Sequence, residues 1–511
     1  MEFIRFENMS HPNYNNWPKW LLGFVLFFLT LSVLVSCEKK PRQDENVVIL
    51  IDGYPMKLTE FRNYYELDPT FPGYIKGQSG LREYAEFLSD RFLTRKLARR
   101  EGLFHRLPFR RYLTFERNKA IIREYYRKQV ADTIKITEAQ IQSALNKMRE
   151  TLRVKHLYVP ERHKAFELYR SLQSGISFDT LEKQVFAGVD SAYGGADLGE
   201  VSFGDLDPAL EAVAYQLKPG DFSPPVQSRW GYHILLLVDR KPNTRWLKLN
   251  PEVKRRKIIG KLKRIREEQA ARDYLKHYLD PLNITVKRDA FLKIITQLDL
   301  PEQRPIRLNY PRNRYLSDEQ LNALRTALEE DLNEIFMTSS LENWSIGDFL
   351  TRLDDLPPDK RPQLNSVAGF KEDIGILIRD AFLLKDALKQ RMDRSAPVDS
   401  TVRSEEMQMS YQYYLKMFYE QFEVDSLVQN YFQNQKSAGG LLADLPPGVL
   451  PGMASVEGYR LYHARRKLHA FLRSEFPEVE ITINDSLIAR EAKTIDWEHP
   501  VRMVAVPQYF R

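Results

Sequence analysis

The sequence predicts an α+β protein in which one small mixed domain is inserted between mainly α-helical lobes. Short β-branched runs, typical of strands, bracket a Gly-rich segment between residues 152 and 242. On both sides of that segment, apolar residues recur at helical spacing over long stretches. The chain has 511 residues, which exceeds one ordinary hydrophobic core, so about two to four domains are expected.

The first 36 residues have the order of a secretory signal peptide. Lys19 precedes an apolar run from Leu21 to Val35, which is shorter than the ~20 residues that a membrane-spanning helix needs. The run closes with Leu34-Val35-Ser36-Cys37, a junction that resembles a bacterial lipobox. Cys37 is the only cysteine, and its thiol can carry a thioether-linked lipid. We therefore expect residues 1–36 to be removed and Cys37 to be acylated. The alternative is an uncleaved membrane anchor that happens to end in cysteine.

Export and lipidation restrict the partners of the mature chain. We expect an extracytoplasmic protein that is lipid-anchored on the periplasmic side of a bacterial membrane, the outer membrane where the cell has one. The net charge of +7 is mild and favours anionic lipid headgroups or acidic clients. Nucleic acid is not expected as a partner, because export separates the chain from it. With Cys37 lipidated, no disulfide can form within one chain, so packed cores must supply the stability.

The mature chain is predicted to begin with a tether and a helical lobe. Residues 37–46 are charged and lack apolar periodicity, which predicts a solvated tether. Residues 47–150 are predicted to form an N-terminal helical lobe that opens with a strand from Val47 to Ile51. Thr137 is predicted to cap a later helix of this lobe. An earlier helix has apolar residues on one face: Leu81, Tyr84, Ala85, Leu88 and Phe92.

The segment after the mixed domain is predicted to be a helical connector over residues 243–300. Its main element is a long helix over 252–279, whose lysines and arginines we interpret as a solvated face rather than a membrane-binding one. Residues 301–511 are predicted to form a mainly helical C-terminal lobe.

One part of the C-terminal lobe resembles the N-terminal lobe in sequence. The segment from Trp344 to Phe349 and the helix after it resemble the segment from Tyr54 to Phe61 and the helix from Leu81. Within these helices, Asp90-Arg91-Phe92-Leu93 matches Asp380-Ala381-Phe382-Leu383. We expect a diverged internal repeat, and two unrelated amphipathic helices are the alternative.

Six short motifs follow one another in the mixed segment. They are Val154-Lys155-His156-Leu157-Tyr158-Val159, Ser174-Gly175-Ile176-Ser177-Phe178, Tyr193 to Gly199, Phe203 to Pro208, Leu217 to Val226 and Trp230-Gly231-Tyr232-His233-Ile234. In this order they resemble the parvulin family of peptidyl-prolyl cis/trans isomerases. The resemblance implies that residues 151–242 form a parvulin domain, a small antiparallel or mixed sheet with surrounding helices.

The reaction that this resemblance implies needs no cofactor, metal or nucleotide. Rotation about an X–Pro bond has a barrier of ~18–20 kcal/mol because the amide is conjugated. The twisted amide is less polar than the planar one, so an apolar pocket that excludes water favours the twisted state. Such a domain is an enzyme that works through the shape and dryness of its pocket.

The resemblance also implies which residues hold the substrate. It places the substrate proline against Leu198, Leu206 and Leu210, with Tyr215 nearby. The family usually has an aromatic residue where Leu210 stands, so the pocket is expected to be looser. Leu206 and Leu210 are expected at the pocket rim, and the alternative is that these leucines are plain core.

Four polar residues correspond to catalytic positions of the family: His156, Asp190, Ser228 and His233. The two histidines are expected to hydrogen-bond on adjacent central strands and hold the pocket floor, with the hydroxyl of Ser228 beside them. The family has a Cys or Asp before its glycine turn, where the ungapped match lands on Val189, one residue from Asp190. The alternative for the histidines is a satisfied core pair with no catalytic part.

The chain as a whole resembles SurA- and PrsA-type extracytoplasmic chaperones, through its parvulin domain, its helical lobes and its start at Ile51-Asp52-Gly53-Tyr54. The resemblance implies unfolded or newly exported polypeptides, and their X-Pro segments, as clients. We expect a peptidyl-prolyl isomerase and chaperone that assists the folding of exported proteins at the bacterial membrane. The alternative is a non-catalytic holdase or assembly scaffold that uses the parvulin domain only to bind peptide.

Overall fold

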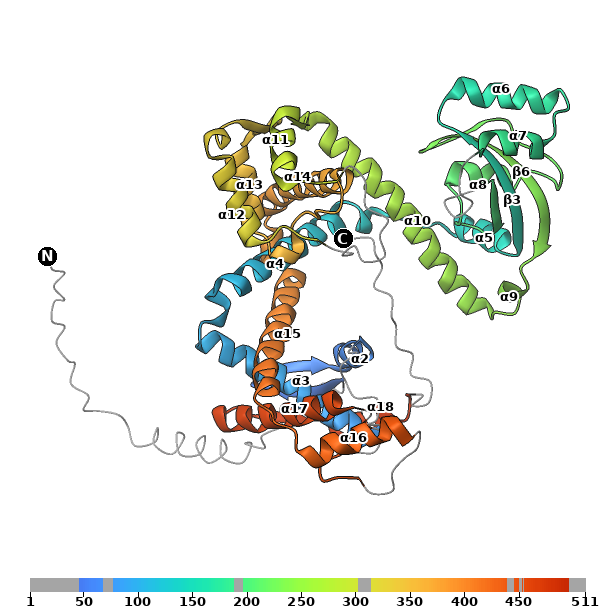
Figure 1. The fold of residues 1–511 in the computed structure, drawn as a ribbon. Helices are drawn as coiled ribbons and strands as arrows, with labels where there is room; N and C mark the ends of the chain where they lie inside the picture. Colours follow the sequence, from blue (N-terminus) through green and yellow to red (C-terminus); the bar gives the residue numbers. More distant parts are fainter. Residues whose placement is uncertain are drawn as a thin grey trace, which may run out of the picture. The chain divides into compact units, whose positions relative to one another are not determined.

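The structure, a computed structural model, describes residues 46–67, 77–187, 196–301, 314–438, 445–449, 453 and 455–495 (Figure 1). The predicted signal peptide, Cys37 and the tether up to residue 45 lie outside the described residues. None of the helices in these ranges combines the length and the apolar character that crossing a bilayer requires.

The chain divides into two compact units, which differ from the consecutive lobes that the sequence suggests. The first unit joins the chain up to Leu103 to the chain from Glu406 onward. The second unit runs from Phe104 to Glu405 and contains the mixed domain. The two ends of the described chain therefore share one unit.

A three-stranded antiparallel sheet in the order β10-β1-β2 lies in the first unit. The predicted strand, β1 (Val47–Ile51), turns at Asp52 and Gly53 into β2 (Tyr54–Lys57). Both turn residues have positive φ, of 50° and 77°, which suits a two-residue hairpin loop. The strand β10 (Ile481–Ile483) pairs with the other edge of β1, so the sheet ties the two ends together.

The helices of the first unit also come from both ends of the chain. They are α2 (Leu58–Leu67), α3 (Gly77–Arg100), α16 (Ser426–Ala438), α17 (Val456–Glu475), α18 (Asp485–Ala492) and the part of α15 (Ala396–Glu420) from Glu406 onward. The helix α3 buries most of its predicted face, although Phe92 is only partly buried. Glu406 accepts hydrogen bonds from Arg95 and Arg99 at 2.6 and 2.9 Å, which attaches α15 to α3.

In the second unit, residues 150–242 form the mixed domain that the sequence predicts (Figure 1). Its antiparallel sheet has the order β4-β3-β6-β5, from β3 (Glu150–Val159), β4 (Asp197–Val201), β5 (Val226–Ser228) and β6 (Gly231–Pro242). The helix α8 (Pro208–Ala214) covers one face of the sheet. The helices α6 (Arg162–Gln173) and α7 (Phe178–Val185) cover the other face.

Helices before and after the mixed domain pack on each other. Thr137 caps α5 (Glu138–Lys147) as predicted, because its hydroxyl accepts the N–H of Gln140 and its own N–H donates to that side chain. The predicted long helix is α10 (Pro251–Leu279). Its contact with α5 includes Trp246 of α9 (Thr244–Leu247) and a small core of Ile141, Ala144, Ile258 and Leu262.

The remaining core of the second unit uses residues that the sequence assigns to the connector and to the C-terminal lobe. The strand β7 (Thr285–Val286) lies in the predicted connector, yet it pairs with β8 (Ile335–Thr338), which pairs with β9 (Trp344–Ser345). A two-residue strand leaves no periodic pattern, so the sequence gives no sign of it. The helices of this core are α11 (Arg288–Leu298), α12 (Asp318–Ala327), α13 (Ile346–Asp354) and α14 (Val367–Lys389), and α4 (Leu107–Gln129) packs on α14.

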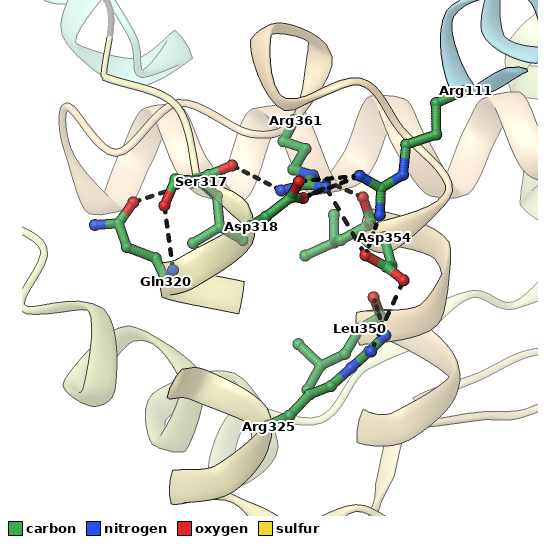
Figure 2. Close-up of polar contacts among 10 residues, drawn as sticks. Arg111, Ser317, Asp318, Gln320, Arg325, Leu350, Asp354 and Arg361 are labelled. Carbon is green, nitrogen blue, oxygen red and sulfur yellow. Dashed lines mark hydrogen bonds and ion pairs between the residues drawn. The ribbon is translucent and has the colours of Figure 1, made fainter. Parts of the chain in front are cut away.

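A network of arginines and aspartates joins α4, α12 and α13 (Figure 2). The side chain of Arg361 is fully buried and donates to the carbonyls of Leu353 and Leu316 and to the carboxylate of Asp318. Arg111 of α4 donates to Asp318 at 3.1 Å and to Asp354 at 2.6 Å. The hydrogen bond from Arg361 is the main cause that holds the pKa of Asp318 below its usual value.

Replacing Arg361 by methionine is expected to destabilise the second unit by about 3 kcal/mol. The reason is that two backbone carbonyls and Asp318 would lose their buried donor. Hydrogen–deuterium exchange of the α12 and α13 amides in the full chain measures this change.

The matched control is Arg325→Gln in the same network. Arg325 lies 3.8 Å from Asp354 and its side chain is 34% exposed, so its loss is expected to cost less than about 1 kcal/mol. Equal exchange rates in the two variants would contradict the role given to Arg361.

Candidate functional site

One face of the mixed sheet carries the predicted site residues. Along β6 the side chains of His233, Leu235 and Leu237 alternate onto one face, and along β3 Val154 and His156 do the same. Below α8 this face is apolar, with a buried core of Leu152, Val154, Val201, Leu210, Ala214, Leu235 and Leu237. The two histidines therefore share a face with the predicted substrate-binding leucines.

The structure brings the two histidines into direct contact. The Nδ1 atoms of His156 and His233 are 3.0 Å apart, and their rings are stacked with centroids 5.2 Å apart. The Nε2 atom of His233 lies 2.8 Å from the Oγ atom of Ser228 on β5. Since each contact needs one donor and one acceptor, the three side chains form an ordered chain of hydrogen bonds.

Burial disfavours a charge on His233, the central member of this chain of hydrogen bonds. The side chain of His233 is only 5% exposed. The pKa of His233 is lowered to about 4, chiefly by its burial and also by the neighbouring His156, whereas Asp207 raises it. The imidazole of His233 is therefore neutral at neutral pH. The two rings cannot both be in the doubly protonated form, because the facing Nδ1 atoms would then both be donors.

Aromatic residues that the sequence interpretation did not select surround the histidines. The ring of Tyr158 lies 5.1 Å from that of His233, and Phe186 stacks on His156 at 5.7 Å. The hydroxyl of Tyr158 donates to the carbonyl of Trp230 at 2.8 Å. Period-2 alternation along β3 could have identified Tyr158, because it lies two residues after His156.

The turn between β5 and β6 ends in an exposed tryptophan beside the site. The N–H of Trp230 donates to the Oγ atom of Ser228 at 3.1 Å, which fixes the hydroxyl in place. The indole itself is exposed, and the guanidinium of Arg229 lies 4.0 Å from its ring centroid. The turn thus holds Ser228 rigidly while presenting an aromatic surface to solvent.

The predicted substrate-binding residues occupy two kinds of position. Leu198 and Leu206 are partly buried and pack against the apolar core of the face. Leu210, which the sequence places at the rim, is 4% exposed and belongs to that core, because α8 turns it toward the sheet. Tyr215 is partly buried, and its hydroxyl donates to the carbonyl of Lys147 at 3.2 Å. Burial raises the pKa of Tyr215, so the hydroxyl stays protonated.

A buried glutamate fixes the turn that carries Leu206. The carboxylate of Glu211 accepts the N–H of Gly204 and lies 3.6 Å from the ammonium of Lys147. Gly204 has a φ of 79°, which favours glycine at this position. Burial raises the pKa of Glu211, whereas these contacts lower it. The position of Leu206 over the sheet therefore depends on a polar anchor on the α8 side.

Two predicted features lie outside the described residues. These are Asp190, with the neighbouring Val189, and the glycine turn at residues 193–195. Within the described ranges, no group of three His, Cys, Asp or Glu side chains is arranged to hold a metal ion.

Comparison with known proteins identifies the domain. Residues 159–239 match the family model described as Rotamase, PPIC-type PPIase domain. The chain is 32% identical over 149 residues to Foldase protein PrsA 2 of Bacillus anthracis, covering 29% of this chain and 47% of the relative. It is 25% identical over 248 residues to Foldase protein PrsA of Caldanaerobacter subterraneus subsp. tengcongensis, covering 42% of this chain and 81% of the relative.

A solved structure of the peptidylprolyl isomerase PrsA from Bacillus anthracis is also similar. It shares 30% sequence identity, covers 32% of this chain and 68% of that chain, and has a TM-score of 0.22. The chain spans about half the length of the first curated relatives that it matches. The mixed domain, which contains residues 159–239, is therefore a PPIC-type parvulin domain like those of peptidyl-prolyl cis/trans isomerases.

Proposed function

We propose that this protein is a parvulin-type peptidyl-prolyl cis/trans isomerase and chaperone that assists the folding of exported proteins. The observation that carries the proposal is the hydrogen-bonded chain of His156, His233 and Ser228 beside the apolar face of a PPIC-type domain. The curated relatives are named foldases, which supports the wider role.

The proposed mechanism depends on the low polarity of the site. A planar X–Pro amide is more dipolar than the twisted one, so a dry apolar surface favours the twisted state. In this site the leucines supply the apolar surface, and the neutral His233 adds no charge that would favour the planar amide. A differential stabilisation of ~4–5 kcal/mol corresponds to about a thousand-fold acceleration or more.

Each site residue has a proposed role. Leu198 and Leu206 contact the substrate proline ring, with Leu210 and Tyr215 packed behind them. His156, His233 and Ser228 keep the floor of the site rigid through their hydrogen bonds. The carboxylate of Asp190, which lies outside the described residues, is proposed to approach the substrate carbonyl.

The proposed clients are unfolded or newly exported polypeptides that contain X-Pro segments. The reaction consumes no nucleotide, so it can proceed in an extracytoplasmic compartment. We place the protein at the membrane through a lipid on Cys37, in the outer membrane where the cell has one. This placement is supported by the apolar run and the small-residue junction that precede Cys37.

Leu206→Ala tests the proposed pocket. Removing this side chain should weaken the binding of a proline-containing peptide by ~1–3 kcal/mol, because the contact with the proline ring is lost. A protease-coupled prolyl isomerisation assay on the mature chain measures the accompanying fall in kcat/KM.

Leu247→Ala is the matched control, since Leu247 is an exposed leucine on α9 and its loss should leave kcat/KM unchanged. An unchanged kcat/KM in a folded Leu206→Ala variant would move the pocket elsewhere. If the unsubstituted chain fails to accelerate isomerisation, the isomerase proposal is wrong.

His233 is expected to titrate with an apparent pKa of about 4 in the folded protein. An unperturbed histidine has a pKa of about 6.5, so between these values the unfolded chain binds more protons than the folded one. The stability of the domain should therefore be complete above pH ~6.5 and decrease as the pH falls toward 4. NMR titration of the imidazole measures the pKa directly, and His233→Asn should flatten the pH dependence of stability. A measured pKa near 6.5 would contradict a buried neutral His233.

Cys37→Ser tests the proposed anchor. A serine cannot form the thioether, so the variant should accumulate as an unprocessed precursor without a fatty-acid label. Ser36→Ala keeps both the thiol and a small residue at the junction, and it should be labelled as the unsubstituted chain is. Metabolic labelling with a palmitate analogue compares the three proteins. Label that persists in Cys37→Ser would refute the assignment.

A further inference from the structure

Two stretches of the chain have the same order of elements. The first contains β1, β2, α2, α3, the 3-10 helix η1 (Leu103–His105) and α4. The second contains β8, β9, α13, α14, η7 (Met392–Arg394) and α15, with one additional 3-10 helix, η6 (Pro358–Lys360), between α13 and α14. Each stretch is followed later by a long helix, a short strand and another helix. These are α10, β7 and α11 for the first, and α17, β10 and α18 for the second. The repeat therefore extends well beyond the helices in which the sequence motifs match.

The turn between the two long helices fixes the register of the repeat. Gly102 and Arg391 both have left-handed backbone, with φ of 66° and 57°, directly before a 3-10 helix. The next residues, Leu103 and Met392, are both buried. In each copy the following long helix has proline as its second residue. A residue in this part of the first copy thus corresponds to the residue 289 positions later.

At this offset, the buried residues of α14 coincide with buried residues of α3. The pairs are Leu81 with Phe370, Ala85 with Ile374, Ser89 with Ile378, Leu93 with Phe382, Thr94 with Leu383, and Ala98 with Ala387. The sequence match of Asp90 with Asp380 is wrong by one residue. It failed because apolar periodicity along a helix allows neighbouring registers, whereas the turn allows only one.

The hairpins of the two copies close with the same hydrogen bond. The N–H of Leu58 donates to the carbonyl of Asn46 at 2.7 Å, and the N–H of Ile346 donates to the carbonyl of Glu334 at 2.9 Å. Both donors are the first residue of the helix after the hairpin, α2 or α13. The hairpins are therefore equivalent in their contacts as well as in their order.

The third strands are equivalent in the same way. Ile481-Thr482-Ile483 corresponds to Ile284-Thr285-Val286, and a helix begins two residues after each strand. The N–H of Asn484 donates to the carbonyl of Val48, and the N–H of Lys287 donates to the carbonyl of Phe336, both at 2.8 Å. These donors and acceptors occupy matching positions in the two copies.

Each third strand pairs with the hairpin of the other copy. The strand β10 follows the second hairpin in the chain but pairs with β1 of the first, and β7 follows the first hairpin but pairs with β8 of the second. The helices are exchanged as well. In the second unit, α4 of the first copy packs on α14 of the second through Ala120 and Ile121. In the first unit, α15 of the second copy is bound to α3 of the first through Glu406.

We propose that the helical part of this protein is two intertwined copies of one lobe, fused in a single polypeptide, in which each copy completes the sheet of the other. The third strand of each sheet is thus supplied by the other copy within the same chain. The proposal does not depend on isomerase activity.

The two copies differ in what they carry between their long helices. The isomerase domain lies between α4 and α10 of the first copy. The corresponding position in the second copy, between α15 and α17, holds residues 421–455. The described part of that segment packs with the start of α17 in a small apolar cluster of Val428, Tyr431, Phe432, Val449, Met453 and Tyr459. In the described residues, the fused pair therefore contains one isomerase domain.

Disulfide cross-linking of a split chain tests the exchange. The protein is produced as two coexpressed fragments, residues 38–307 and 308–511, with Leu50→Cys in the first and Thr482→Cys in the second. Leu50 and Thr482 are direct cross-strand partners, and such pairs lie within reach of a disulfide. We expect the fragments to copurify in equal amounts and to become joined covalently on mild oxidation.

The matched control combines Leu50→Cys with Thr285→Cys, both in the first fragment. Thr285 holds the position in the first copy that Thr482 holds in the second, so a disulfide here would mean that the strand returns to its own hairpin. We expect no such disulfide by mass spectrometry. Its formation, or the absence of the 50–482 disulfide, would overturn the exchange.

The same pairs in the intact chain, with Cys37→Ser, keep the test valid if the fragments do not fold. The 50–482 disulfide should then form within one chain, and the 50–285 disulfide should not form. Covalent dimers on a non-reducing gel would overturn exchange within a single chain.

Discussion

Both units depend on the pairing of a short hairpin with a third strand that arrives from a distant part of the chain. A two-stranded hairpin is at best marginally stable alone, so β1–β2 needs β10 and β8–β9 needs β7. The helix that follows each third strand packs in the same core, since α18 contacts β1 and α11 contacts β8. These contacts are non-local, so the first unit cannot complete its core until the end of the chain has been made.

The isomerase domain differs, because its sheet is built from one continuous segment of the chain. Its end strands are close together, since β3 and β6 pair from Glu150 with Pro242 to Val159 with Tyr232. The helices α5 and α10 on either side of it also pack on each other. A domain whose two ends lie together can be carried between two helices of a lobe without interrupting the core of that lobe. The pairing of β3 with β6 also sets the site, because it brings His156 and His233 together.

The sequence predicts what local patterns determine. The strand β1, the cap at Thr137 and the helix α10 follow from β-branched runs, a capping residue and helical periodicity. The histidine pair followed from the resemblance, because spacing along a chain does not say which strands become neighbours. Arg361 could not be predicted as core, since an arginine is rarely fully buried and its acceptors come from two distant segments, one with Leu316 and Asp318 and one with Leu353. Leu210 was placed at the rim because the sequence does not fix how a two-turn helix faces a sheet.

The contact between Ser228 and His233 raises the question of why the site should not be a hydrolase. A serine nucleophile needs a histidine that accepts its proton and becomes an imidazolium, usually stabilised by a carboxylate on its other nitrogen. Here the other nitrogen of His233 faces His156, a neutral or positively charged group, at 3.0 Å. Burial and this neighbour lower the pKa of His233 to about 4, so the imidazolium is strongly disfavoured at neutral pH. The same features that make His233 a poor base keep it uncharged, which suits a reaction in which no proton moves.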